Sequence, residues 1–290
     1  MIRACRRIAS AVLCLAVVFS LKASGCTGFA AYSGQAVYGV NFDWPGEPEL
    51  EFALEHGPGA AKRFVLRFKP EAGWFTMCGL NERGLFASLQ EVPSRSQRGL
   101  GQGPTLMLGL LFDQALESAS SVPEVSGLIG NRRLIPPPGI YLHCLFADVR
   151  GRTLIVEPGA RANQLIPGSA NFTVMTNFYN SDLAGQDYRK VQGFGTDRYR
   201  VTMEELRKVK GAVSLETGLG ILKKAAQAIT QASLLFQPEQ QQVYLALKAD
   251  FTRVYRFDLK GETVSTLRGF TMERKQPLTS VRGAELSGWK

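Results

Sequence analysis

Short stretches of hydrophobic residues, bounded by turn-forming residues, recur along the chain and predict a strand-rich protein. The stretch that begins at Phe29 turns at Ser33-Gly34 and returns from Val37 to Phe42, which predicts a hairpin. A second hairpin is predicted across Arg150-Gly151. Further strands are expected at residues 64–68, 74–78, 85–89, 141–148, 153–157, 172–176, 243–247 and 253–259.

Helical periodicity occurs in three places. In the segment 106–119, hydrophobic residues at 108, 111, 112, 115 and 119 form one stripe, which predicts a helix with a buried face. Segments 199–208 and 215–230 are also predicted to be helical. Strands, a helix, strands, two helices and strands follow in that order, so we expect an α+β fold in which helices cover sheets.

The first 25 residues have the pattern of an export signal. Three arginines within the first seven residues precede a mostly apolar run at 11–21, and Ala23 and Gly25 supply the small residues of a cleavage site. The apolar run is shorter than the about 20 residues that a membrane-spanning helix needs. We therefore expect a signal peptide at 1–25, one domain at 26–290, and a periplasmic or secreted protein whose first residue is Cys26.

The same cleavage site permits a second interpretation. Ala23-Ser24-Gly25-Cys26 resembles a bacterial lipobox, although Ala23 stands where leucine is usual. Lipidation would modify both the thiol and the α-amine of Cys26. A lipid-anchored binding module therefore remains an alternative to an enzyme, and it is the one case in which we expect contact with a membrane.

Composition excludes some classes of function. The chain has 34 basic and 25 acidic residues, and removal of the signal would leave 30 and 25, a net charge of +5. No run of basic residues indicates nucleic-acid binding. Cys26, Cys78 and Cys144 would remain in the mature chain. Three cysteines do not make a disulfide scaffold, which leaves either one Cys78–Cys144 bridge or buried free thiols.

A cysteine at a chain start can hydrolyse an amide without a cofactor. The reaction needs a nucleophile, a base and donors for the developing oxyanion. A chain-terminal Cys26 supplies the thiol together with an α-amine, whose reference pKa of about 7.7–8.0 suits a base at neutral pH. Asp43, at the end of the first hairpin, is placed to hold that amine. The chain has two histidines; no metal site is predicted, and His143, in an apolar strand, is predicted to be a core residue.

Several motifs occur in an order that resembles a known family. They are Cys26-Thr27-Gly28, Gly39-x-Asn41-x-Asp43, Asn81-Glu82-Arg83-Gly84-Leu85, His143-Cys144-Leu145-Phe146-Ala147-Asp148 with Gly151 and Ile155-Val156-Glu157, Met175-Thr176-Asn177, and Asp197-Arg198-Tyr199. This set resembles the choloylglycine hydrolase family, which includes bile salt hydrolases and penicillin V acylases. The resemblance spans residues 26–200, and the remaining third is similar only in its strand pattern.

The resemblance implies a four-layer αββα sandwich, the fold of N-terminal-nucleophile hydrolases, and a role for each of five residues. Cys26 would attack the acyl carbon and Asp43 would orient its α-amine. Asn177 would donate to the oxyanion, and Arg198 would stabilise charge near the thiol. Gln90 lies close to the position of an asparagine that binds oxyanion and substrate in bile salt hydrolases. The resemblance implies no cofactor, and it is compatible with a homo-oligomer.

One departure from the family pattern affects the choice of substrate. The family usually has an arginine three residues before the aspartate, and this chain has Val40. A small N-acyl amide is the expected substrate, with bile salts, penicillin V, N-acyl homoserine lactones and fatty amides as open alternatives. Hydrolysis and transfer of the acyl group to an amine also both remain open, because an amine can replace water in resolving a thioester.

Overall fold

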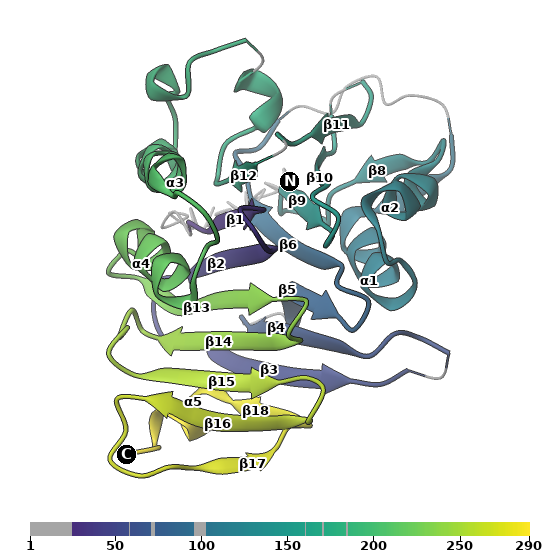
Figure 1. Ribbon diagram of the computed structural model, residues 1–290. Coiled ribbons are helices and arrows are strands. Elements are labelled where there is room, and N and C mark those ends of the chain that lie inside the picture. The colour runs from purple at the N-terminus through teal and green to yellow at the C-terminus, as the bar shows by residue number, and fades with distance from the viewer. Residues whose placement is uncertain are drawn as a thin grey trace, which may run out of the picture.

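Two eight-stranded antiparallel sheets dominate the computed structural model of this chain (Figure 1). The structure describes residues 25–57, 59–70, 73–95, 103–159, 161–169, 171–183 and 185–290, so nearly all of the predicted signal peptide lies outside the described residues. Sheet 1 contains, in spatial order, β12 (Phe172–Met175), β1 (Thr27–Ala31), β2 (Val37–Asp43), β13 (Thr230–Gln237), β14 (Gln242–Leu247), β15 (Val254–Asp258), β16 (Thr263–Arg268) and β17 (Lys275–Pro277).

Sheet 2 packs against sheet 1. It contains β11 (Gln164–Pro167), β10 (Thr153–Glu157), β9 (Leu142–Ala147), β6 (Phe86–Glu91), β5 (Phe75–Asn81), β4 (Arg63–Lys69), β3 (Glu49–Glu55) and β18 (Ser280–Arg282). The short strands β7 (Thr105–Met107) and β8 (Arg133–Ile135) form a separate parallel pair.

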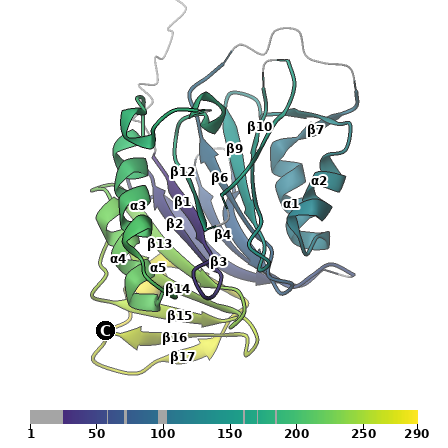
Figure 2. The ribbon, with the colours of Figure 1, turned by 45° about the horizontal axis from the view of Figure 1, so that its top comes forward.

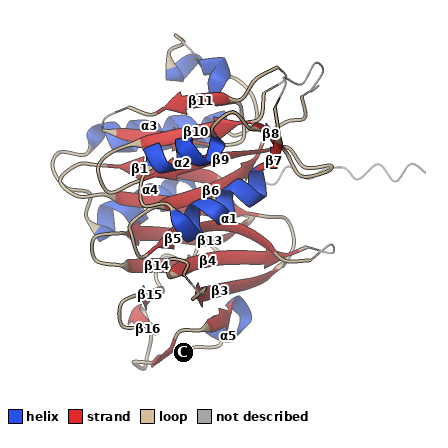
Figure 3. Cartoon of the chain, turned by 90° about the vertical axis from the view of Figure 1, so that its right-hand side faces the viewer, coloured by secondary structure: helices blue, strands red, loops and turns tan. Residues whose placement is uncertain are grey.

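Helices cover the outer face of each sheet and complete four layers (Figure 2). The helices α1 (Leu108–Ser118) and α2 (Val122–Ile129) lie on sheet 2, as Figure 3 shows, and α3 (Thr196–Lys208) and α4 (Leu215–Ala225) lie on sheet 1. The remaining helical segments are α5 (Gly283–Ser287) and two 3₁₀ turns, Asn180–Leu183 and Tyr188–Lys190. The predicted αββα architecture is therefore confirmed.

The alternation of side chains along β2 shows how the sequence specifies these layers. Tyr38, Val40 and Phe42 point between the sheets, where Tyr38 stacks on Phe86 with ring centroids 4.9 Å apart. The residues between them face the helices, and Asn41 donates from Nδ2 to a backbone carbonyl of α4. Because successive strand residues point to opposite faces, a strand that is buried on both sides places apolar and polar residues in two different layers.

Two sequence predictions are corrected by the structure. The helix expected at 106–119 begins at Leu108, since the residues before it form β7. The helix expected at 215–230 ends at Ala225, and Thr230 opens β13. Of the two alternatives for Cys78 and Cys144, the structure shows buried free thiols. The first hairpin and the hairpin across residues 150–151 are confirmed.

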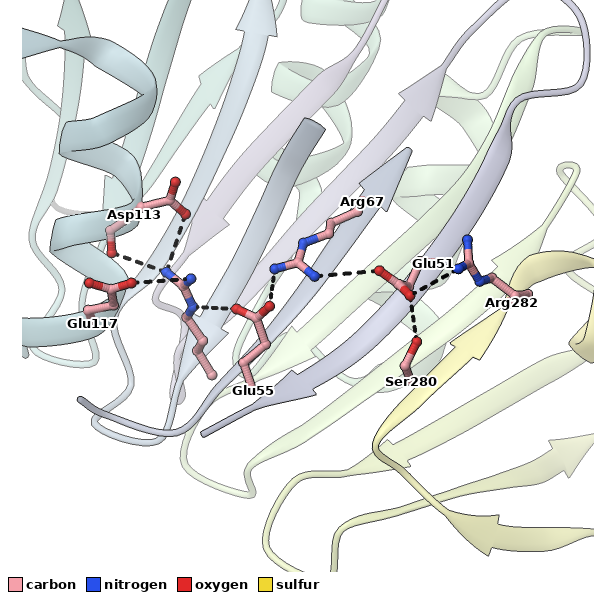
Figure 4. A network of polar contacts seen from close by, with 8 residues as sticks. Glu51, Glu55, Arg67, Asp113, Glu117, Ser280 and Arg282 are labelled. Carbon is pink, nitrogen blue, oxygen red and sulfur yellow. Dashed lines mark hydrogen bonds and ion pairs between the residues drawn. The ribbon is translucent and has the colours of Figure 1, made fainter. Parts of the chain in front are cut away.

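The outer face of sheet 2 beyond α1 bears a ladder of charges instead of a helix (Figure 4). Arg63 donates to Glu55 at 2.8 Å and lies 3.3 Å from the carboxylates of both Asp113 and Glu117 on α1. The ladder continues through Arg67 and ends at Glu51, Ser280 and Arg282. It ties α1 to the strands beside it.

Among the described residues, no helix is long and apolar enough to cross a membrane.

Candidate active site

Four of the predicted site residues converge where three neighbouring strands of sheet 1 begin or end. Cys26 immediately precedes β1, and Asp43 is the last residue of β2. Asn177 is the second residue after the end of β12, with Thr176 between them. Because β12, β1 and β2 are antiparallel neighbours, the start of β1 lies beside the ends of the other two strands (Figure 1). Arg198 reaches this edge from the first turn of α3.

Arg198 connects the other three residues. Its Nη1 donates to the carbonyl oxygen of Cys26 and, at 3.0 Å, to Thr27 Oγ1, and its Nη2 donates to Asn177 Oδ1 at 2.8 Å. The same Nη1 lies 3.8 Å from Asp43 Oδ2. The side chain is 4% exposed, so these groups take the place of water around its charge.

The backbone before Arg198 explains how its side chain fits. Gly195 caps α3 with φ of 84°, a left-handed conformation that favours glycine. A Cβ atom at Gly195 would lie 2.8 Å from Arg198 Nη2 and 3.0 Å from the Asn177 nitrogen. Glycine therefore allows the turn into α3 to pass close to the guanidinium.

Asn177 binds the backbone nitrogen of Cys26. The Cys26 nitrogen donates to Asn177 Oδ1 at 2.8 Å, and Asn177 Nδ2 donates to the Glu91 carbonyl oxygen at 2.8 Å. In this chain Gly25 is still attached, so the Cys26 nitrogen is a peptide nitrogen that stands in for the α-amine of the mature chain. The amide carries a second N–H on Nδ2, which is the group that the predicted oxyanion role requires.

Asp43 lies on the helix side of the site and is held by two residues that the sequence did not indicate. Its Oδ2 accepts from Gln227 Nε2 at 2.7 Å, and its Oδ1 accepts from Thr230 Oγ1. Burial raises the pKa of Asp43, although these two hydrogen bonds and Arg198 oppose the rise. The carboxylate contacts Arg198, whereas the Cys26 nitrogen is held by Asn177.

The Cys26 thiol is buried between the sheets, where the residue is 5% exposed. Burial and the charge of Asp43 raise its pKa from 9.0 to about 12, against a hydrogen bond from the Asp43 backbone and the charge of Arg198. The thiol of the uncleaved chain is therefore protonated at neutral pH. A thiolate requires a base beside it, which is what cleavage after Gly25 would create.

Gly25 has no room for a side chain. A Cβ atom there would lie 2.5 Å from Arg198 Nη2 and 3.1 Å from Gln227 Nε2. Both Gly25 and Cys26 are buried, so the bond between them is enclosed in the folded chain. Removal of residues 1–25 would open this space beside the new α-amine.

Gln90 faces β1 from the opposite sheet. It is fully buried, and the position of a Cβ atom at Gly28 would be 2.7 Å from Gln90 Nε2 and 3.2 Å from Ser88 Oγ. Neither amide atom of Gln90, nor Ser88 Oγ, has a hydrogen-bond partner among the residues that the structure describes. Gly28 and Cys26 are two residues apart on the same face of the chain, so these polar atoms form a niche next to Cys26.

The close approach of Gln90 to Gly28 means that a side chain at position 28 should disturb the niche. The variant Gly28→Ala should lower turnover by about 10- to 100-fold, because its Cβ atom displaces the Gln90 amide. Turnover and melting temperature should be measured together for G28A, Q90A and the double variant. Gly220→Ala is the control, since no atom lies within 4 Å of the added methyl group. Fully additive losses in the double variant would contradict a shared role of Gly28 and Gln90.

Val40 stands where the resembling family usually has an arginine, and it places an apolar side chain beside the niche. Val40 is paired with Gly28 across β1 and β2, is 3% exposed and belongs to the core between the sheets. The cation that lowers the pKa of the thiol is instead Arg198. His143 is fully buried and hydrogen-bonded, which confirms its prediction as a core residue.

Comparison with solved structures identifies the fold. A mutant of conjugated bile acid hydrolase from Clostridium perfringens is 15% identical, with 84% of this chain and 96% of that chain covered and a TM-score of 0.61. Penicillin V acylase from Agrobacterium tumefaciens is also 15% identical, covers 84% and 91%, and has a TM-score of 0.56. The chain has their fold. The predicted fold, a four-layer αββα sandwich, is thereby confirmed.

The N-acylethanolamine-hydrolyzing acid amidase ortholog of Caenorhabditis elegans is similar over 73% of this chain and 93% of its own, with 16% identity and a TM-score of 0.53. No protein-family model matches the sequence, and no curated protein matches it. The likeness is thus one of three-dimensional structure at low sequence identity.

Proposed function

We propose that this protein is an exported amidohydrolase that cleaves a linear, non-peptide amide through a thioester on Cys26. The observation that carries the proposal is the hydrogen bond from the Cys26 nitrogen to Asn177, in a cluster with Arg198 at the start of β1. The names of the three similar structures describe hydrolysis or removal of acyl groups from conjugated bile acids, penicillin V and N-acylethanolamines. An acylated amine is the substrate class that these names share.

The proposed reaction begins with transfer of the thiol proton to the α-amine of Cys26. The sulfur attacks the carbonyl carbon, and the second N–H of Asn177 Nδ2 and the amide of Gln90 stabilise the oxyanion. When the intermediate collapses, the C–N bond breaks and the α-ammonium returns the proton to the leaving amine. Water, deprotonated by the same amine, then hydrolyses the thioester and releases the acid.

The burial of Cys26 favours this proposal over a lipid-anchored module. Its thiol lies in the core between the sheets and its nitrogen is bonded to Asn177. A diacylglyceryl group on the sulfur and an acyl chain on the nitrogen would not fit at a residue that is 5% exposed. Export to the periplasm or the medium is part of the proposal and rests on the pattern of residues 1–25.

Intact mass spectrometry of protein recovered from an exporting host tests the proposal. We expect a chain that starts at an unmodified Cys26. Mixing it with a conjugated bile salt, penicillin V, an N-acyl homoserine lactone and a fatty acid ethanolamide, followed by acid quench, should add the acyl mass of one of them to Cys26. A lipid-sized increment, or a chain that retains residues before Cys26, would contradict the proposal. New amide product after addition of amines would show an acyltransferase.

A further inference from the structure

A buried histidine–glutamate pair lies behind Asn177. His143 on β9 and Glu157 on β10 have side chains that are 0% exposed, and His143 Nδ1 lies 3.3 Å from Glu157 Oε1. The other ring nitrogen, Nε2, lies 2.7 Å from the carbonyl oxygen of Thr176. A carbonyl oxygen can only accept, so Nε2 carries a proton and donates it to Thr176.

Glu157 holds the chain on the other side of Asn177. Its Oε1 accepts from the Asn180 nitrogen at 2.5 Å, and its Oε2 accepts from the Ser181 nitrogen at 3.2 Å. Burial raises the pKa of Glu157, but the hydrogen bond and charge of His143, together with hydrogen bonds from the Ser181 side chain and the Asn180 N–H group, hold it below the ordinary value. The carboxylate is therefore charged and fully bonded.

The two side chains thus fix the segment 176–181 at both ends. Asn177, between the two fixed points, must place Oδ1 against the Cys26 nitrogen and Arg198 while Nδ2 meets the Glu91 carbonyl. The segment leaves β12 at Met175 and enters a 3₁₀ turn at Asn180, so no sheet pairing holds the backbone of Asn177.

The geometry points to a positioning role for the pair: we propose that His143 and Glu157 set the distance between Asn177 and Cys26 and so control the rate of acyl transfer. This inference rests on the proposed function. Among the contacts of the described residues, neither side chain touches the Cys26 thiol, and a buried pair of this kind is by itself weak evidence for a role in stability. The contacts of the pair with the backbone on both sides of Asn177 can matter for the rate, because a displacement of about 1 Å in a catalytic group lowers the rate about 100-fold.

The decisive variants alter the pair while keeping its volume. Glu157→Gln should lower kcat by about 10- to 100-fold with little change in KM, because a glutamine amide places a donor against one of the two backbone N–H groups. His143→Gln should retain most of kcat, since its amide nitrogen can still donate to Thr176, whereas His143→Ala should lose as much as Glu157→Gln. In the Asn177→Ala background, Glu157→Gln should cost nothing further.

A matched control separates positioning from stability. Thr173→Val removes a buried hydrogen bond, 2.7 Å between Thr173 Oγ1 and Thr153 Oγ1, from β12 farther from Asn177. It should lower the melting temperature and leave kcat unchanged. An unchanged kcat in Glu157→Gln, or losses that follow the melting temperature equally in both variants, would overturn the inference and leave the amidohydrolase proposal standing.

The inference can also be judged if the wild-type protein turns over none of the amides, which would count against the proposed function. The rate at which iodoacetamide alkylates Cys26 reports on the nucleophile without any substrate. Equal changes of this rate in Glu157→Gln and Asn177→Ala, absent in Thr173→Val, would support coupling of the pair to Cys26 through Asn177. A rate unchanged by Glu157→Gln would refute it.

Discussion

Cys26→Ala should abolish amide turnover, with a loss of at least about 10⁴-fold, and should leave the protein folded. The thiol is the proposed nucleophile, and removing a nucleophile removes the covalent route altogether. The fold should persist because the deleted atom leaves a cavity no larger than one sulfur in the core between the sheets. Turnover of the best amide and thermal unfolding by circular dichroism measure the two effects.

Cys78→Ala provides a control of the same chemistry. Cys78 is also a free, fully buried cysteine in the core between the sheets. Both alanine variants lose one buried sulfur atom, so their melting temperatures should fall by comparable amounts, but Cys78→Ala should keep its turnover. Appreciable activity in Cys26→Ala, or an equal loss of activity in the two variants, would exclude Cys26 as the nucleophile.

The convergence of Cys26 and Asp43 could be predicted because it follows from strand order. A hairpin directly after Cys26 brings the end of its second strand, and therefore Asp43, back beside the start of its first. The pairing of β1 with β12 cannot be read from local pattern, since the two strands are more than 140 residues apart in the chain. For Asn177 and Arg198, the prediction depended on the family resemblance.

The residues that hold Asp43 could not be predicted. Gln227 and Thr230 fell within the helix expected at 215–230, and no element was predicted at 231–237, where an apolar run bounded by polar residues fits a buried strand as well as a helix. In the structure, Leu234 and Phe236 face the core between the sheets and Leu235 faces α4, which is the alternation of a strand buried on both sides. Packing of β13 between β2 and β14 decided between these alternatives.

The contacts of Gln90 and His143 could not be predicted from the sequence for a different reason. His143 lay within a predicted strand, whereas the strand predicted at 85–89 stopped one residue before Gln90; in the structure the two residues are paired across β6 and β9. Which face of each strand meets Gly28 or Thr176 depends on how sheet 2 is placed against sheet 1. That placement is a property of the whole core, because a shift of one residue in register would reverse the faces.

Asp43→Asn should lower turnover by about 100-fold, because loss of the carboxylate beside Arg198 would displace the guanidinium that holds Asn177 and Cys26, while leaving the protein at least as stable at pH 7. Burial raises the pKa of Asp43 above that of an exposed aspartate. The folded state therefore binds a proton more tightly than the unfolded state, and ionisation of this group costs stability as the pH rises from about 4 through the raised pKa. Asparagine avoids this cost.

The two effects separate the role of Asp43 in catalysis from its role in the fold. Melting temperatures of wild type and Asp43→Asn should converge below about pH 3, where the wild-type carboxyl group is protonated in both states, and should favour the variant or remain equal at pH 7. Thr230→Val is the matched variant, because it keeps the charge and removes one of the hydrogen bonds that Asp43 accepts. It should lower stability at pH 7 and retain more turnover than Asp43→Asn. A destabilised Asp43→Asn that keeps wild-type turnover would show that the carboxylate serves the fold and not the reaction.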